Sequence, residues 1–231
     1  MHTKILWPWE LPEVLNGIAV IADVWGATTN ITTFLRKGVK KLLIVNKNNV
    51  QRAKTEYKNA LVIGESLELP PGFFDASNYP SDVTSIDVEN RIVLYMSNNG
   101  SHVIESAFQR KAIKTITVSF TNIRVISDYL KNLKENVYLI PSGDIGSSDS
   151  KVAEDLICVE SLDKLIKGKT VDLEKAQEDA KSFISVNYGD ENFDQESNFK
   201  VVFNLNSSTS IPLCNQNKQG FIEIEDFNKL A

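Results

Sequence analysis

The chain has 231 residues, and 25 basic against 30 acidic side chains give a formal net charge of −5. This balance argues against a general nucleic-acid binder, which usually carries a strong basic excess. Hydrophobic and charged fractions of 42% and 24% indicate an ordinary globular chain. No membrane-spanning segment is visible, because Pro8, Glu10 and Pro12 interrupt the apolar start. Two cysteines in unrelated contexts and two histidines disfavour a zinc site and predict a cytoplasmic protein.

The first two-thirds of the chain alternates between Val/Ile/Leu-rich runs and helical patterns. Such alternation predicts a three-layer α/β fold, with a mostly parallel sheet and helices on both faces. Right-handed crossovers then bring the carboxyl ends of the strands to one edge, where such sheets bind ligands. The predicted strands are residues 18–24, 41–45, 60–64, 91–96, 115–120 and 136–140, and the predicted helices are residues 27–37, 49–57, 100–111, 122–134, 151–167 and 172–187.

Two regions depart from this alternation. Residues 65–88 are rich in Pro, Gly, Asp, Asn and Ser and lack a period, which fits either a functional loop or a plain surface excursion. The tail carries two β-like pieces at residues 199–205 and 221–224. They predict a small C-terminal β extension, either at an edge of the sheet or as an annex over residues 199–231. We expect residues 1–231 to form a single α/β domain.

The end of the first predicted strand carries polar groups. Asp23 ends the strand, and Thr28 and Thr29 follow at the start of a helix. A helix N-terminus offers free amide donors to an anion, and Asp23 could hold a divalent cation that bridges to that anion. The alternative is that these side chains cap the helix. In the same way, Glu65 follows a strand, and Asp75 and Asn78 in the loop either close over the crevice or serve a turn.

Two further segments join strands to helices. Asn99, Gly100 and Ser101 form a small-residue turn that suits close approach by an oxyanion. Glu154 and Asp155 open a later helix, where acidic residues also favour the helix dipole without any further function. The sequence lacks the G-x-G-x-x-G, Walker and G-x-S-x-G patterns, which disfavours a dinucleotide-binding protein, a P-loop enzyme and an α/β-hydrolase.

Five short patterns occur in order along the chain: D-V-x-x-A-T-T at 23–29, G-E at 64–65, G-F-x-D-x-x-N-x-P at 72–80, N-G at 99–100 and E-D-L-x-C at 154–158. Together they resemble the 2-phosphosulfolactate phosphatase family, an α/β group of magnesium-dependent acid phosphatases associated with coenzyme M biosynthesis. The resemblance extends from about residue 20 to residue 224.

The resemblance implies Mg²⁺-assisted hydrolysis of a phosphomonoester on a small anionic substrate. The charge balance and the lack of a visible membrane-spanning segment predict no nucleic-acid or membrane partner, and a homo-oligomer stays open. Asp23 and Glu65 would be catalytic. The implied metal-binding carboxylates are Asp23, Asp75, Glu154 and Asp155, and the implied anion contacts are Thr28, Thr29, Asn99, Gly100, Ser101 and Gly143.

Three positions depart from the family pattern, which reads R-A-T-T, G-E-R and N-G-T-R. Gly26, Ser66 and His102 stand where the family has arginine. Arginine forms bidentate contacts with phosphate that are worth about 1.5 to 3 kcal/mol each, so three losses would weaken substrate binding or catalysis. An alternative function is therefore a catalytically degenerate family member that binds a metabolite or a partner protein.

Overall fold

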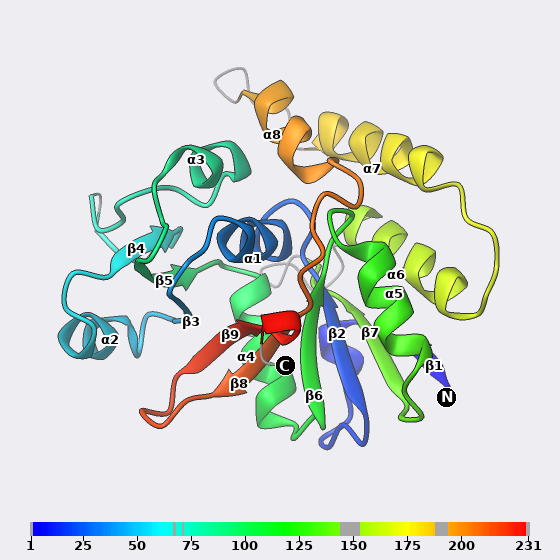
Figure 1. Cartoon of the computed structure of the whole chain (residues 1–231), viewed down its shortest axis with the longest axis horizontal. Helices are drawn as coiled ribbons and strands as arrows, with labels where there is room; N and C mark the ends of the chain where they lie inside the picture. The colour runs from blue at the N-terminus through cyan, green and yellow to red at the C-terminus, as the bar shows by residue number, and fades with distance from the viewer. Residues whose placement is uncertain (1, 67, 71, 144–152, 188–193, 230–231) are drawn as a thin grey trace.

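A computed structural model describes residues 2–66, 68–70, 72–143, 153–187 and 194–229. Within these residues, nine strands form one sheet (Figure 1): β1 Thr3–Ile5, β2 Ile18–Ala22, β3 Lys41–Ile44, β4 Leu61–Gly64, β5 Ile92–Met96, β6 Lys114–Val118, β7 Val137–Pro141, β8 Pro212–Gln216 and β9 Ile222–Asp226. Their order across the sheet is β1-β7-β2-β6-β8-β9-β3-β5-β4.

Helices cover both faces of this sheet: α1 Ala27–Arg36, α2 Val50–Glu56, α3 Pro80–Ser85, α4 Gly100–Gln109, α5 Ile123–Lys131, α6 Ala153–Ile166, α7 Leu173–Asn187 and α8 Gln195–Val202. One face packs against α1 and α4. The other packs against α5 and α6 beside β2 and against α2 beside β5. The three-layer α/β fold is therefore confirmed. None of the described helices has the length and apolar character needed to cross a membrane.

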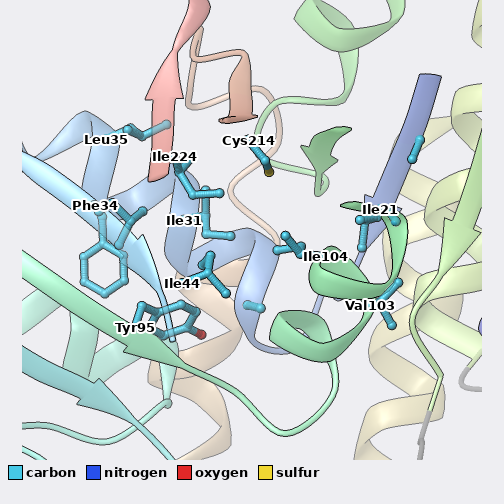
Figure 2. Packing of buried hydrophobic residues seen from close by; sticks show 14 of the residues in the cluster. Ile21, Ile31, Phe34, Leu35, Ile44, Tyr95, Val103, Ile104, Cys214 and Ile224 are labelled. Carbon is cyan, nitrogen blue, oxygen red and sulfur yellow. The ribbon is translucent and has the colours of Figure 1, made fainter. Parts of the chain in front are cut away.

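The β2 strand illustrates why near-continuous apolar runs become central strands. All five of its residues are buried, with Ile18, Val20 and Ala22 in the core under α5 and α6. Successive side chains of a strand point to opposite faces, and Ala19 and Ile21 accordingly lie in the core under α1 and α4. Figure 2 shows Ile21 in this second core. Burial on both faces removes the polar alternation that a half-exposed strand would show.

The sheet consists of two parallel groups that run in opposite senses. The strands β1, β7, β2 and β6 are mutually parallel, and so are β3, β5 and β4. Between them lie three antiparallel pairings, β6 with β8, β8 with β9, and β9 with β3. Because three antiparallel pairings separate the two groups, β3, β5 and β4 run opposite to β1, β7, β2 and β6. The expectation that crossovers bring all strand ends to one edge of a single parallel sheet is thus too simple.

The C-terminal β8–β9 hairpin lies inside the sheet, and its predicted position at an edge is wrong. It fills the space between β6 and β3, which belong to the opposed groups. The hairpin also contributes to the core, because Cys214 and Ile224 are buried on the face that α1 covers (Figure 2). Pairing of β9 on both sides supplies hydrogen-bond partners that an edge strand would lack.

The predicted strand at residues 199–205 is also wrong. This segment belongs mainly to α8, which begins after Asp194, whose carboxylate accepts a hydrogen bond from the Ser197 amide at 3.0 Å. Phe199, Val202 and Phe203 recur at helical spacing and pack with the core under α5 and α6. Residues 65–88 include the short helix α3, and β1 and β8 are strands that the sequence pattern did not predict.

Candidate active site

Asp23 lies where the carboxyl end of β2 meets two helix N-termini. Its carboxylate accepts backbone hydrogen bonds from Ala27 at the start of α1 and from Gly100 at the start of α4. Residue 23 keeps some exposed surface, but its carboxylate is enclosed by protein. Burial first, and then the charges of Asp155 and Glu65, raise its pKa to about 8 despite these amide donors. Three acidic segments that are distant in sequence therefore meet at one point.

Gly100 allows this meeting because it has no side chain. A Cβ at this position would lie 2.4 Å from the Ala27 Cβ and 2.5 Å from Asp23 Oδ2, closer than non-bonded atoms approach. The start of α4 can therefore touch both α1 and Asp23. The Gly100 amide, which the sequence predicted as an anion contact, donates to the Asp23 carboxylate.

Asp155 joins α6 to the ends of two strands. One of its carboxylate oxygens accepts a hydrogen bond from the Val24 amide at 2.7 Å. The other accepts from Ser142 Oγ at 2.9 Å and from the Gly143 amide at 3.3 Å. Burial, followed by the neighbouring Glu154 charge, still raises the pKa of Asp155 to about 8. Its contacts make Asp155 an anchor that holds α6 against the β2 and β7 ends.

Glu154 differs from its neighbour because part of its carboxylate is unsatisfied. The residue is only 2% exposed, and its Oε2 has no hydrogen-bond partner among the described residues. Burial first, and the Asp23 charge as well, raise its pKa to about 7. A buried carboxylate oxygen without a donor is costly, and a cation or a proton would relieve that cost.

Glu65 approaches Asp23 from the β4 end and is held by an amide network. The Asn78 Nδ2 atom donates to Glu65 Oε1 at 3.3 Å. Asn30 on α1 donates in turn to the Asn78 carbonyl oxygen at 2.8 Å and to the Tyr95 hydroxyl at 3.1 Å. The Tyr95 hydroxyl also donates a hydrogen bond to Asn78 Oδ1. Asn30 and Tyr95 were not predicted as site residues, because they sit inside an amphipathic helix and an apolar strand.

Asp75 has a different position from the other acidic residues. It is exposed, and its carboxylate accepts a hydrogen bond from the Val62 amide of β4 at 2.7 Å. Its own amide donates to the Val62 carbonyl oxygen at 2.7 Å, so this part of the loop runs beside β4. The side chain that this loop places against Glu65 is that of Asn78. These contacts pair the loop with β4 and do not close a turn, and metal binding by Asp75 stays a prediction.

The predicted hydroxyl contacts serve the local backbone. The Thr28 and Thr29 hydroxyls donate to the carbonyl oxygens of Asp23 and Val24, both at 2.8 Å. Ser101 is buried, and its Oγ accepts a hydrogen bond from the Ser97 amide at 2.9 Å. Neither α1 nor α4 has a side-chain cap from the residues that the structure describes, so these three side chains bond to the preceding backbone instead of capping their helices. Their contact with an anion, and that of the half-buried Asn99 at the start of α4, stay predictions.

The acidic cluster provides hard oxygen donors of the kind that Mg²⁺ prefers. Within the described ranges, no three His, Cys, Asp or Glu side chains form a ready metal site. Mg²⁺ needs fewer, since it usually keeps several waters and binds one or two carboxylates plus a substrate phosphate. Asp23 and Glu154 fit this requirement, because the Asp23 charge raises the pKa of Glu154 and one Glu154 oxygen has no partner among the described residues.

The three positions where the family has arginine differ in their placement relative to the acidic cluster. Gly26 is adjacent, because a Cβ there would lie 3.2 Å from both Asp23 Oδ1 and Asn78 Nδ2. Ser66 directly follows Glu65 and is half-buried, whereas His102 is exposed on α4. Side chains at positions 26 and 66 therefore start beside the acidic residues.

The raised pKa values predict that the folded protein is more stable at acidic pH than at alkaline pH. Folding raises the pKa to about 8 for Asp23 and Asp155 and to about 7 for Glu154. Unfolded carboxyls titrate near about 4, so between these limits the unfolded state binds fewer protons and stability falls as pH rises. We expect a lower melting temperature at pH 8 than at pH 5 in EDTA, measured by scanning fluorimetry. Glu154→Gln should reduce this fall by at least about 3 °C, and an equal fall in the variant would contradict the assignment.

Residues that follow strands of both parallel groups thus supply one enclosed acidic site, although the two groups run in opposite senses. Asp23 follows β2, Glu65 follows β4, and the amides of Gly100 and Gly143, which bond to Asp23 and Asp155, follow β5 and β7. The molecule is a three-layer α/β protein with its polar groups placed at strand ends, as in ligand-binding α/β proteins.

The family follows from comparison with known proteins. Residues 6–222 match the family model for 2-phosphosulpholactate phosphatase, and the chain belongs to that family. Similar proteins include one from Thermoplasma volcanium, 29% identical over 166 residues, which covers 70% of this chain and 74% of the relative. Another, from Clostridium perfringens (strain SM101 / Type A), is 29% identical over 210 residues, with coverage of 87% and 83%. Both relatives are named probable 2-phosphosulfolactate phosphatase.

Proposed function

We propose that this protein is a 2-phosphosulfolactate phosphatase-like phosphomonoester hydrolase that Mg²⁺ assists. Family membership supports the reaction class. The observation that carries the proposal is the enclosed Asp23 carboxylate, which accepts from the first amides of α1 and α4 and whose charge raises the pKa of Glu154, a buried residue with one oxygen unpartnered among the described residues. A small anionic phosphoester is the substrate class, and we place the protein in the cytoplasm.

Asp23 and Glu154 would hold the Mg²⁺ ion, which supplies charge screening for the phosphate and orients water when bound. Without a cation, Asp23 and Glu154 retain protons near neutral pH because their pKa values are about 8 and about 7. Cation binding therefore releases protons from the site. Asp155 acts as a positioning residue, since its hydrogen bonds keep Glu154 at the end of β2.

Glu65 is suited to accept a proton. It is exposed, and its carboxylate is oriented by Asn78. Hydrolysis breaks the ester P–O bond and forms a new P–O bond to water. Glu65 takes one proton from that water as it attacks, and the leaving alkoxide gains one proton from solvent. This assignment combines an exposed base with an enclosed carboxylate pair.

The test is a phosphate-release assay with phosphosulfolactate and simple phosphomonoesters. We expect release in the presence of Mg²⁺, loss of at least about 90% of the rate in EDTA, and recovery with excess Mg²⁺. Recovery matters because it separates cation removal from denaturation by the chelator. Absence of release from every ester in Mg²⁺ would contradict the proposed activity, and full activity in EDTA would contradict the role of the metal.

The residues Gly26, Ser66 and His102 favour a second candidate, a degenerate family member that binds a metabolite or a partner protein. The discriminating variant is Ser66→Arg with His102→Arg, because neither position is fully buried. Adding Gly26→Arg gives the complete set, although a Cβ there would lie 3.2 Å from Asn78 Nδ2 and Asp23 Oδ1, so these two side chains would have to shift. Phosphate release by the unmodified protein would exclude the second candidate, and release by the arginine variants alone would support it.

A further inference from the structure

A pocket of about 610 Å³ opens beside Glu65, between the end of β4 and the loop that follows it. This volume lies within the usual range of about 300–1,000 Å³ for small-molecule sites. Glu65 connects the pocket to the acidic cluster, because it lines the pocket and its charge also acts on Asp23. A phosphate bound at the cluster could therefore extend its organic group into the pocket.

The lining of this pocket is unsuited to a second anion. Its wall includes apolar surface from Leu69, Pro70 and Phe74, and Glu65 contributes a carboxylate. The described lining residues include neither Lys nor Arg. Lysines that reach the same loop have other partners. Lys47 pairs with Glu68 at 2.6 Å, and the Lys54 Nζ atom lies over the Phe73 ring, 4.5 Å from its centroid.

We propose that this pocket binds the organic group of the phosphoester and selects an uncharged group with an apolar face over one that carries a sulfonate or carboxylate. The proposal rests on the proposed phosphatase function. Apolar surface of the ligand would displace water from Leu69 and Phe74, whereas an acid group would meet the Glu65 charge without a compensating cation. Ser66 and Ser77 add hydroxyls that tolerate a neutral polar substituent.

The first experiment compares kcat/KM for benzyl phosphate, methyl phosphate, phosphoglycolate and phosphosulfolactate. We expect benzyl phosphate to exceed both acid-bearing esters by at least about 10-fold. Phe74→Ala should lower kcat/KM for benzyl phosphate by about 10-fold through KM, with methyl phosphate little changed. Phe227→Ala is the matched control, because this aromatic residue is exposed and packs instead against Tyr129. Preference for either acid-bearing ester would overturn the proposal.

A second variant and a binding measurement keep the test decisive. Ser66→Lys adds a cation to the wall and should raise kcat/KM for phosphoglycolate by at least about 10-fold relative to benzyl phosphate; no change in that ratio would contradict the proposal. If no ester is hydrolysed, the proposed function fails. Calorimetry with benzylphosphonate and phosphonoacetate then tests the pocket alone. Tighter binding of benzylphosphonate, lost in Phe74→Ala, would support the pocket, and tighter binding of phosphonoacetate would overturn it.

Discussion

Asp23→Asn is expected to lower the rate of phosphate release by about 10²–10³-fold, the range that loss of one group for electrostatic stabilisation costs. Asn keeps the size of the side chain and one oxygen that can accept from the Ala27 or Gly100 amide. It removes the negative charge that Mg²⁺ would bind. Since the proposed role of Asp23 is electrostatic, the loss should appear in kcat at saturating Mg²⁺ as well as in the affinity for Mg²⁺.

The same substitution should leave the folded state largely intact. Burial raises the pKa of Asp23 to about 8, so the ionised form is disfavoured in the metal-free fold. Asn removes that penalty, and the variant should gain stability relative to the unmodified protein as pH rises toward 8. Urea unfolding at pH 6 and pH 8 measures this change. Asp128→Asn is the matched control, because Asp128 lies on α5 in an exposed ion pair with Lys131. Activity within about 10-fold of the unmodified protein would remove Asp23 from the chemistry.

Gly100→Ala is expected to cost about 2–3 kcal/mol of stability and most of the activity. In an ordinary exposed helix the same change would stabilise the protein by about 1 kcal/mol. The opposite sign is expected here because the new methyl group would meet the Ala27 Cβ and Asp23 Oδ2 at about 2.5 Å or less. The start of α4 would have to move away from the acidic cluster.

Gly26→Ala provides a graded comparison. A Cβ at position 26 would lie 3.2 Å from the ends of the Asp23 and Asn78 side chains, which can shift by a few tenths of an ångström. We therefore expect a smaller loss of stability than for Gly100→Ala, measured by urea unfolding and by the phosphate-release rate. If Gly100→Ala is as stable as the unmodified protein, the close contact between α1 and α4 is not required for folding.

The main elements of the fold could be predicted because their signals are local. The runs that become β2, β3, β5 and β7 are apolar on both faces, and this pattern depends only on neighbouring residues. The segment at residues 199–205 was predicted incorrectly because Val and Phe favour strands in isolation, whereas the Asp194 cap and packing under α5 favour a helix. Short β1 and β8 depend on pairing with distant strands, so their sequences carry little signal.

The acidic site, like the fold, could be predicted only in part from local sequence. Asp23, Glu65, Glu154 and Asp155 could be selected because each carboxylate stands at a junction between a strand or turn and the next element. The hydrogen bonds around these residues could not be predicted from local sequence. Asp75 bonds to β4, and the Asn78 contact to Glu65 depends on Asn30 reaching across from α1. These are interactions between segments far apart in the chain.

Sequence alone determined the α/β class, the order of most elements and the candidate acidic residues, because periodicity and residue type at strand ends are properties of short segments. Only the tertiary structure decided that the β8–β9 hairpin enters the sheet and reverses one parallel group against the other. It also decided which carboxylate oxygen has no partner within the described part of the chain and where the pocket opens beside Glu65. The physical reason is that burial, pKa and cavity shape depend on every segment packed around a group, including those far away in sequence.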